Sequence, residues 1–242
     1  MKKNKNPLFS PNSTIVLCSK ITPPVEDDEL QIRSRLLNQL DDMSSMSLLL
    51  VQAPAGYGKT SLLKQFYRSL SLKKVQVAWL TLCHTENEPL VFIANVCAAF
   101  GRLHAEINSQ MEPLFNATPP YEVEDIIETL IVSCEVFDKP IVLMLDDYHE
   151  ITQPEVHKAF FYLLTHLPSN VHCIMASRVR PPFAFHKLEE NGKVVFIERK
   201  ELSFNEEETS DFICNFSDIR LNNENLAGFS VQTEGWITAI KL

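Results

Sequence analysis

Short apolar runs alternate with amphipathic segments along most of this chain. Five runs are almost wholly apolar and are bounded by polar or turn-forming residues, as is typical of buried strands: residues 47–52, 75–82, 141–145, 171–176 and 194–198. Between them, apolar residues recur at spacings of three and four, which predicts helices over residues 62–70, 89–100, 123–137 and 156–167. The alternation predicts an α/β fold with a parallel sheet covered by helices on both faces.

The two ends of the chain differ from this alternating region. A helical stripe that includes Ile32 is expected within residues 30–40, after a polar, proline-broken tail. A capping box at residues 205–208 opens a helix, and a second helix is expected near Asn225. We therefore predict three parts: an N-terminal tail and arm (1–43), a central domain (44–200) and the beginning of a helical subdomain (201–242).

The composition restricts the function. The 242 residues have a formal net charge of −9, and this acidic balance argues against nucleic-acid binding by this chain, which would need a basic face. The N-terminus has no continuous apolar segment for a secretion signal, and no apolar stretch reaches the roughly 18 residues of a membrane span. The six scattered cysteines lack metal-binding spacing and are predicted to be buried, reduced thiols, so a cytoplasmic protein is expected.

The segment from Ala53 to Thr60 reads A-P-A-G-Y-G-K-T and follows the first predicted strand directly. Gly56 and Gly58 permit backbone conformations that let amides point at phosphate oxygens. In such a loop Lys59 bridges the β- and γ-phosphates, and the Thr60 hydroxyl ligates Mg²⁺. The motif usually begins with Gly, and Ala53 is the smallest replacement, so we expect the loop to be retained. The predicted nucleotide-binding residues here are Ala55, Gly56, Tyr57, Gly58, Lys59, Thr60 and Ser61.

Two carboxylates, Asp146 and Asp147, follow the apolar run 141–145. We predict that Asp146 binds Mg²⁺, directly or through water, and that Asp147 orients or deprotonates the attacking water. The alternative for Asp147 is a cap on the following turn. His149 is interpreted as a hydrogen-bonded structural residue. Together with the glycine loop, the pair predicts a P-loop NTPase of the RecA or AAA type, with ATP or ADP and Mg²⁺ as cofactors.

Other polar residues follow predicted strands on the same edge of the sheet. Arg178 comes directly after the run 171–176 and is predicted to contact the γ-phosphate as a catalytic sensor, with Arg180 as a less favoured candidate. Glu86 is a candidate for a water-mediated phosphate contact. The carboxyl ends of parallel strands share one edge, so these residues, the loop and the Asp pair are expected to meet there. Near the N-terminus, Arg33 is a candidate for covering the bound base.

The combination of motifs resembles a known family. The A-P-A-G-Y-G-K-T loop, the L-D-D-Y-H segment at 145–149, the Ser177-Arg178 pair and Gly235-Trp236 are similar to those of the signal-transduction ATPases with numerous domains, the STAND class. The most similar branch is that of the MalT-like, LuxR-type ATP-dependent transcription activators. The resemblance covers residues 19–242. The family's Gly-x-Pro motif, which lies against the nucleotide, corresponds to residues 235–237, where the proline is absent.

The resemblance implies a molecular switch. Members of the family hold ADP at rest, exchange it for ATP when an inducer binds a distant sensor domain, and then self-associate, while slow hydrolysis resets them. DNA is contacted only through a C-terminal domain outside this chain, and no membrane is involved. By matching motif positions, phosphate binding is carried over to Gly56, Gly58, Lys59 and Thr60, metal binding to Asp146, water activation to Asp147 and γ-phosphate sensing to Arg178.

Two other functions are compatible with the same loop. A constitutive AAA-like motor or remodelling ATPase would turn over continuously and use an arginine supplied between subunits. A small-molecule phosphotransferase usually needs an arginine-rich substrate lid, and no such cluster follows the loop. A switch instead predicts tightly held ADP and a turnover below about one per second, slower than the median enzyme at about ten.

Overall fold

The computed structural model describes residues 17–24, 31–118, 121–190, 192–216 and 232–238. The predicted tail up to residue 16 and the helix expected near Asn225 lie outside these ranges. Within the described residues, none of the helices combines the length and the apolar character that crossing a bilayer demands. The three-part division of the chain stays a prediction.

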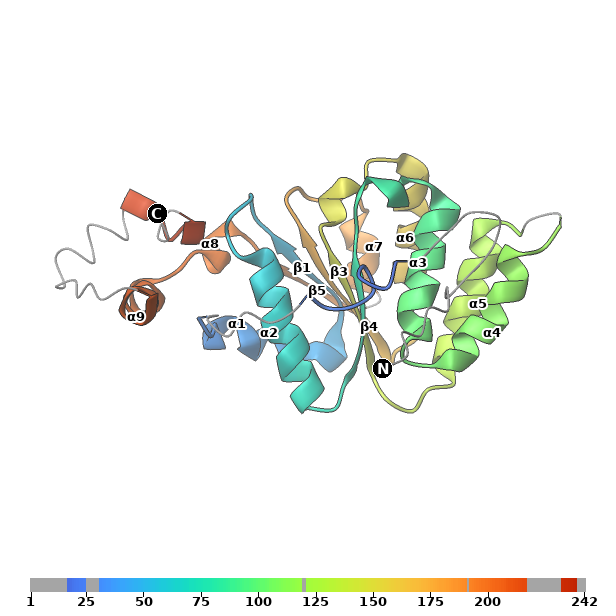
Figure 1. Ribbon diagram of the computed structural model, residues 1–242, viewed down its shortest axis with the longest axis horizontal. Helices are drawn as coiled ribbons and strands as arrows, with labels where there is room; N and C mark the ends of the chain where they lie inside the picture. The colour runs from blue at the N-terminus through green and yellow to red at the C-terminus, as the bar shows by residue number, and fades with distance from the viewer. Residues whose placement is uncertain (1–16, 25–30, 119–120, 191, 217–231, 239–242) are drawn as a thin grey trace, which may run out of the picture.

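A five-stranded parallel sheet forms the centre of the molecule, with the strand order β2-β3-β4-β1-β5 (Figure 1). All five strands were predicted, and each boundary lies within one residue of its expected position. The agreement arises because strands buried on both faces are continuous apolar runs, which stand out in a sequence. The strands are β1 (Met46–Gln52), β2 (Gln76–Thr81), β3 (Ile141–Asp146), β4 (Val171–Ser177) and β5 (Lys193–Ile197).

Helices cover both faces of this sheet, as the sequence predicts (Figure 1). On β1 the side chains of Leu49 and Val51 pack toward α2, whereas Leu48 and Leu50 pack into the larger core on the other face. This alternation follows from the two-residue period of a strand. The helices are α2 (Lys59–Leu72) on one face, and α3 (Pro89–Gly101), α5 (Val123–Glu135), α6 (Pro154–His166) and α7 (Phe185–Glu190) on the other.

Three helices within the described residues were not predicted, and one predicted stripe is wrong in part. The unpredicted helices are α4 (Ala105–Phe115), which packs on α3 and α5, and the short helices α7 and α8 (Arg199–Leu202). In α4, a proline lies inside the helix and only Ile107 and Met111 are buried, so its apolar period is weak. In the segment 30–40, α1 (Ser34–Leu37) is only four residues long. Ile32 is 66% exposed, because it precedes the helix and does not share its buried face.

The cysteines follow the prediction only in part. Cys97, Cys134 and Cys173 are buried thiols, and burial raises the pKa of Cys134 to about 12, as expected for inert core residues. Cys18 and Cys214 are exposed, so the expectation of general burial is wrong for them. Neither belongs to the core of the sheet, and this explains why their residue type misled the prediction.

A small helical part follows the sheet and packs around its own apolar cluster of Phe204, Phe212 and Ile213. It contains α8 (Arg199–Leu202) and α9 (Glu206–Phe216). The predicted capping box is present, because the Asn205 side chain accepts from the Glu208 amide and the Glu208 carboxylate accepts from the Asn205 amide.

A buried ion pair ties the segment before α1 to this helical part. The Arg33 guanidinium donates to Glu208 Oε1 at 2.9 Å and to the carbonyl oxygens of Leu202 and Ser203, and it lies 4.4 Å from the ring centroid of Phe204. Burial alone would raise the pKa of Glu208, but the hydrogen bond and charge of Arg33 outweigh it and lower that pKa. The interaction joins residues 175 positions apart.

We expect Glu208→Gln to destabilise the helical part by about 3 kcal/mol, because Arg33 would remain buried without its counter-charge. The side-chain carbonyl of glutamine can still accept from the Asn205 amide, so the variant keeps the helix cap. Hydrogen exchange of α8 and α9 measures this loss locally, and thermal unfolding measures it globally. The matched control is Glu207→Gln, which changes an exposed residue of the same helical turn. Equal protection of the two variants would show that the ion pair contributes nothing.

Candidate functional site

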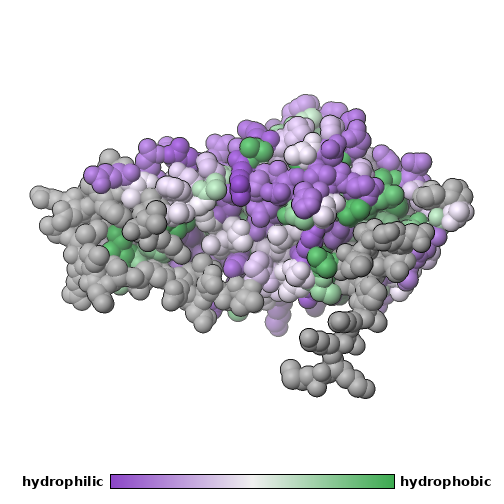
Figure 2. All heavy atoms as spheres, turned by 45° about the horizontal axis from the view of Figure 1, so that its top comes forward, coloured by the Kyte–Doolittle hydropathy of each residue, from purple (hydrophilic) through white to green (hydrophobic). Residues whose placement is uncertain are grey.

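The carboxyl ends of β1, β3 and β4 are neighbours, and the three segments singled out in the sequence follow these ends directly. The edge lies at the top of Figure 1, where α2 begins. When this edge is turned toward the viewer, the described surface is mainly hydrophilic, with scattered apolar residues (Figure 2). An edge of this kind is where open parallel sheets bind their ligands.

The glycine loop between β1 and α2 has the conformation that the motif requires. Gly56 and Gly58 have φ angles of 82° and 79°, a region that side chains disfavour. Ala53, which replaces the usual first glycine, is 2% exposed, and its amide donates to the Ser177 carbonyl at 3.3 Å. Its methyl group joins the apolar core beneath α2, so the substitution is accommodated by packing.

Lys59 lies within the curve of this loop. Its side chain is almost fully buried, and Nζ donates to the carbonyl oxygens of Ala53 at 2.8 Å and Pro54 at 2.9 Å. Burial lowers the pKa of Lys59, and the positive charge of Arg178 lowers it further. Asp147 and Asp146 oppose both effects. Because the charges of Arg178 and of the Asp pair act on Lys59, the loop, the Asp pair and the end of β4 belong to one site.

Asp146 and Thr60 form the part of the site that fits a divalent cation. Asp146 is 2% exposed and accepts hydrogen bonds from the Thr60 hydroxyl and, at 3.0 Å, from the Asp147 amide. Burial raises the pKa of Asp146 to about 6, and the adjacent Asp147 contributes to the rise. A buried carboxylate beside a hydroxyl supplies the oxygen ligands that Mg²⁺ prefers, so these residues fit the predicted ion.

Asp147 occupies a strained backbone position. Its φ of 57° and ψ of 39° are left-handed, which a residue with a side chain rarely adopts, and such strain is concentrated at functional sites. The short turn η4 (Tyr148–Glu150) follows, but the Asp147 side chain makes no capping hydrogen bond to it. With 39% of the side chain exposed, the carboxylate is available to solvent and ligand. This geometry disfavours the alternative that Asp147 is only a cap.

The two arginines after β4 differ in their surroundings. The Arg178 side chain is exposed, and its charge acts on both Lys59 and His149. Arg180 instead lies over the rings of Phe185 and Phe196, at 4.7 and 4.4 Å from their centroids. The structure therefore brings Arg178 to the site and gives Arg180 a packing role.

Arg33 and Glu86 are both held by other partners. Arg33 is engaged by Glu208, as described above, so its contact with a base stays a prediction. Glu86 is 1% exposed, pairs with Lys20 at 2.5 Å and caps the turn η3 (His84–Asn87). The partner of Glu86 is therefore the N-terminal arm, whose next residue, Ile21, packs into the core.

The segment 232–238 also contacts the loop. Trp236 donates from Nε1 to the Ala55 carbonyl at 3.2 Å, and its ring stacks on Tyr57 at a centroid distance of 6.4 Å. Thr238 donates to the Gly56 carbonyl at 3.1 Å. Gly235 has a φ of 66°, and a Cβ there would lie 2.5 Å from the Phe204 carbonyl oxygen, so only glycine fits. The family motif pointed to Gly235 and Trp236, but no sequence signal identified Thr238.

Sequence reasoning also missed the surroundings of His149. This ring was expected to be hydrogen-bonded, yet both of its nitrogens are buried without a hydrogen-bond partner. Asn87 fixes the same turn: its side-chain N–H donates to the Glu150 carbonyl at 2.7 Å, and its side-chain oxygen accepts from the Thr152 amide at 2.7 Å. Contacts between such distant loops leave no periodic pattern in a sequence.

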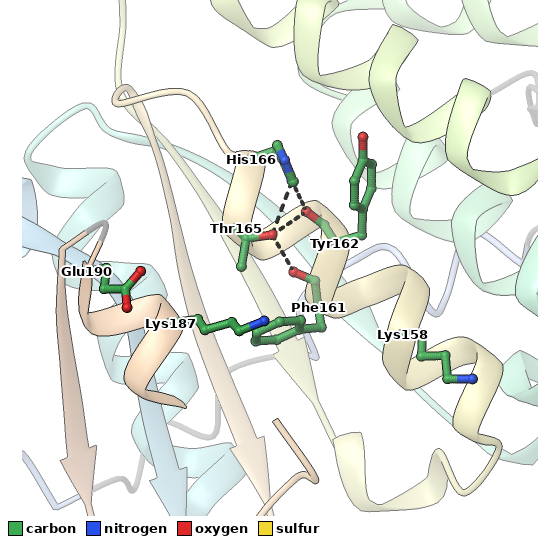
Figure 3. A pocket seen from close by; sticks show the side chains of 7 residues that line it. All are labelled: Lys158, Phe161, Tyr162, Thr165, His166, Lys187 and Glu190. Atoms are coloured by element: carbon green, nitrogen blue, oxygen red, sulfur yellow. Dashed lines mark hydrogen bonds between the residues drawn. The ribbon is translucent and has the colours of Figure 1, made fainter. Parts of the chain in front are cut away.

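A separate hollow of about 440 Å³ lies between α6 and α7 (Figure 3). It is on the face of the sheet opposite α2 and contains none of the motif residues. Thr165 is satisfied there by the carbonyl oxygens of Phe161 and Tyr162. The lining residues are Lys158, Phe161, Tyr162, Thr165, His166, Lys187 and Glu190.

Comparison with curated proteins reveals similarity along nearly the whole chain. It is 30% identical over 229 residues to the HTH-type transcriptional regulator MalT of Yersinia enterocolitica and 28% identical to MalT of Yersinia pestis. Each alignment covers 94% of this chain and 25% of the relative. The chain therefore spans about a quarter of the length of the curated relatives it matches. A scan of protein-family models gave no match.

Solved structures agree on the fold. Cdc6p from Pyrobaculum aerophilum has a TM-score of 0.53 at 13% identity, covering 86% of this chain and 52% of its own. The ORC1 protein of Aeropyrum pernix has a TM-score of 0.51 at 13% identity, covering 89% of this chain and 59% of its own. At this identity the likeness concerns the fold alone, and it confirms the predicted P-loop NTPase class. By sequence the chain is similar to part of the MalT regulators, and it has the fold of the P-loop NTPases.

Proposed function

We propose that this chain is the nucleotide-binding switch of a longer transcriptional regulator, alternating between ADP-bound and ATP-bound states and hydrolysing ATP slowly. One observation carries the proposal. The Lys59 amine, the Thr60–Asp146 pair and Asp147 are gathered at the edge of the sheet where the glycine loop follows β1. A metabolic enzyme would need a binding site for a second substrate beside the loop. Binding of the phosphates of a nucleotide is enough to explain why these groups are gathered.

In the bound state the loop amides and Lys59 hold the phosphates. Lys59 exchanges its two carbonyl partners for phosphate oxygens, which are stronger acceptors because they are charged. Thr60 and Asp146 hold the ion, which supplies positive charge to the phosphates when bound. Asp147 accepts the proton of the attacking water, and Arg178 contacts the γ-phosphate from the end of β4.

The contacts of segment 232–238 support a switch over a motor. The Trp236 and Thr238 side chains bond to carbonyl oxygens of the same loop that would bind phosphate. A change in loop conformation on nucleotide exchange therefore reaches the helical part of the chain directly. We infer that a full-length protein uses this route to report the bound nucleotide and to self-associate with ATP bound. DNA binding would belong to its other domains, in the cytoplasm.

Purified protein should release adenine nucleotide when it is denatured and analysed by anion exchange, with a bias toward ADP. Lys59→Ala should abolish nucleotide retention, because it removes the buried positive charge that the loop would present to the phosphates. The control is Lys158→Ala, an exposed lysine on α6. A wild-type protein that is empty and ignores added ATP would refute nucleotide binding, and unaltered retention by Lys59→Ala would refute the role of the loop.

Asp147→Asn should bind ATP with wild-type affinity but hydrolyse it at least about a hundredfold more slowly, because the amide cannot accept the proton of water. Single-turnover hydrolysis of labelled ATP measures the step. Asp211→Asn, an exposed substitution on α9, is the control. A wild-type turnover well above about one per second would favour the motor alternative. Undiminished hydrolysis by Asp147→Asn would move the base elsewhere.

Asp146→Asn should stabilise the ligand-free protein at pH 7.5 by up to about 2 kcal/mol while weakening Mg²⁺-dependent nucleotide binding. The raised pKa of Asp146 means that its ionised form opposes folding above pH of about 6, whereas this penalty disappears as the pH falls toward the ordinary value for aspartate. The stabilisation should therefore shrink between pH 7.5 and 5. Urea titrations at both pH values measure it, and an equal effect at both would contradict the assignment.

A further inference from the structure

The N-terminal arm is attached to the outermost strand of the sheet on the side of β2. The Lys20 carbonyl accepts from the Thr81 amide at 2.8 Å, at the carboxyl end of this strand. Ile21 is 2% exposed within the core, and its carbonyl accepts from the Arg102 guanidinium at 2.8 Å. The arm therefore occupies a backbone donor that an edge strand would otherwise leave unpaired.

The Lys20 amine extends this attachment into a cluster of three side chains that follow β2. Nζ lies 2.5 Å from Glu86 Oε1, 2.7 Å from Thr85 Oγ1 and 3.1 Å from Cys83 Sγ. The Cys83 sulfur is also 3.2 Å from Thr85 Oγ1. A lysine nitrogen and a cysteine sulfur, 63 positions apart in the chain, are thus in direct contact.

The surroundings of Cys83 are those of a reactive thiol. Cys83 is partly exposed, whereas Cys97, Cys134 and Cys173 are buried in the core. Reactive cysteines are typically both accessible and next to a cationic group. Lys20 supplies the cation here, and its nitrogen becomes a nucleophile beside the sulfur when it loses a proton.

Glu86 is placed to accept that proton. Burial alone would lower the pKa of Lys20, but its hydrogen bonds to Glu86 and Cys83 outweigh burial and raise the pKa. The resting amine is therefore charged. At 2.5 Å, the Glu86 carboxylate is the nearest of its three side-chain partners, and it is 1% exposed. A proton that leaves Lys20 can thus pass to Glu86 without first entering bulk water.

We propose that hydrogen peroxide links Cys83 to Lys20 through a reversible sulfur–nitrogen bond, a sulfenamide, which joins the N-terminal arm covalently to the end of β2. Sulfenic acids condense in this way with a backbone nitrogen, and here a lysine nitrogen is already in contact with the sulfur. The link needs no nucleotide, so the inference is independent of the proposed ATPase function.

Two steps form the link. First, the Cys83 sulfur bonds to one oxygen of peroxide, the O–O bond breaks, and the thiol proton joins the leaving hydroxide as water. Second, the charged amine of Lys20 passes one proton to Glu86, its nitrogen bonds to the oxidised sulfur, and the S–O bond breaks. The second proton of the nitrogen joins the leaving hydroxide as water. Sulfur has then lost two electrons, and peroxide has gained them.

A small thiol reverses the reaction. Its sulfur bonds to the Cys83 sulfur, and the S–N bond breaks, so that Lys20 returns to a free amine by taking up a proton. A second thiol then attacks the mixed disulfide and releases Cys83 as a thiol, while the two small thiols leave as a disulfide. Peroxide fixes the arm, and the reducing thiol pool of a cell releases it.

Peptide mapping after peroxide treatment tests the link. The test protein carries Cys18→Ser and Cys214→Ser, which remove the two exposed thiols. After peroxide and trypsin, without reductant, residues 6–33 should be joined to residues 75–102, because a linked Lys20 is no longer a cleavage site. The joined mass should be about 2 Da below the sum of the two peptides, and dithiothreitol should separate them.

Lys20→Arg separates the link from the ion pair. Arginine keeps a positive charge beside Glu86, but its guanidinium is not a nucleophile, so the two peptides should stay apart. Cys83 should then be oxidised further, to acids that add about 32 or 48 Da. The matched control is Lys73→Arg, which replaces another ion-paired lysine, bound to Asp41 at 2.9 Å, and should form the link like the test protein.

The link should also stabilise the fold. It closes a loop between residues 63 positions apart, so peroxide should raise the thermal midpoint of the test protein by at least about 5 °C. Dithiothreitol should abolish the rise, and Lys20→Arg should not show it. An unchanged midpoint in protein that peptide mapping shows to be linked would overturn the claim that the bond fixes the arm.

The other outcomes are equally decisive. Cleavage at Lys20 after treatment, with Cys83 either unchanged or carried on to its acids, would overturn the proposal. A joined pair of any other mass would overturn the sulfenamide. In the wild-type chain, a Cys18–Cys83 disulfide would join the same segments but leave Lys20 cleavable, and this result would show that the amine is not the partner of Cys83.

Discussion

Two opposite charges, Lys59 and Asp146, are held almost completely out of water at one edge of an apolar sheet. Burial of such groups is unfavourable unless partners compensate, and here the partners are loop carbonyls, a hydroxyl and a backbone amide. The order of the sheet makes the arrangement possible, since β4 lies between β3 and β1 and brings their carboxyl ends together. A different strand order would separate the loop from the Asp pair, and neither segment alone forms a site.

The strained and unsatisfied features of the molecule gather at this same edge. Asp147 has a left-handed backbone, Asp146 is a carboxylate with a raised pKa, and His149 is an orphaned ring. The folded protein would be more stable if each of these residues were replaced by a simpler one. A protein retains such features where binding or catalysis requires them. The remainder of the sheet is conventional in its packing, which supplies the stability that the edge lacks.

The sequence was sufficient for the sheet and for the phosphate loop, because both depend on local patterns: continuous apolar runs and a glycine spacing. It was insufficient wherever a contact joins distant segments. Glu208 on α9 binds Arg33, which precedes α1 and lies 175 residues earlier in the chain. Asn87 fixes the turn after β3 although the two belong to different loops. The proline inside α4 hid that helix, since only tertiary packing on α3 and α5 stabilises it. His149 was misjudged because burial without a partner cannot be read from residue type.

The central claim is that the loop after β1 and the carboxylates after β3 enclose the phosphates of one nucleotide. The most direct measurement is a structure of the protein with Mg²⁺ and a non-hydrolysable ATP analogue. The account predicts that Lys59 Nζ leaves the carbonyl oxygens of Ala53 and Pro54 and lies about 3 Å from β- and γ-phosphate oxygens, with Asp147 facing the γ-phosphate. A nucleotide bound elsewhere, with Lys59 still on its two carbonyls, would contradict it.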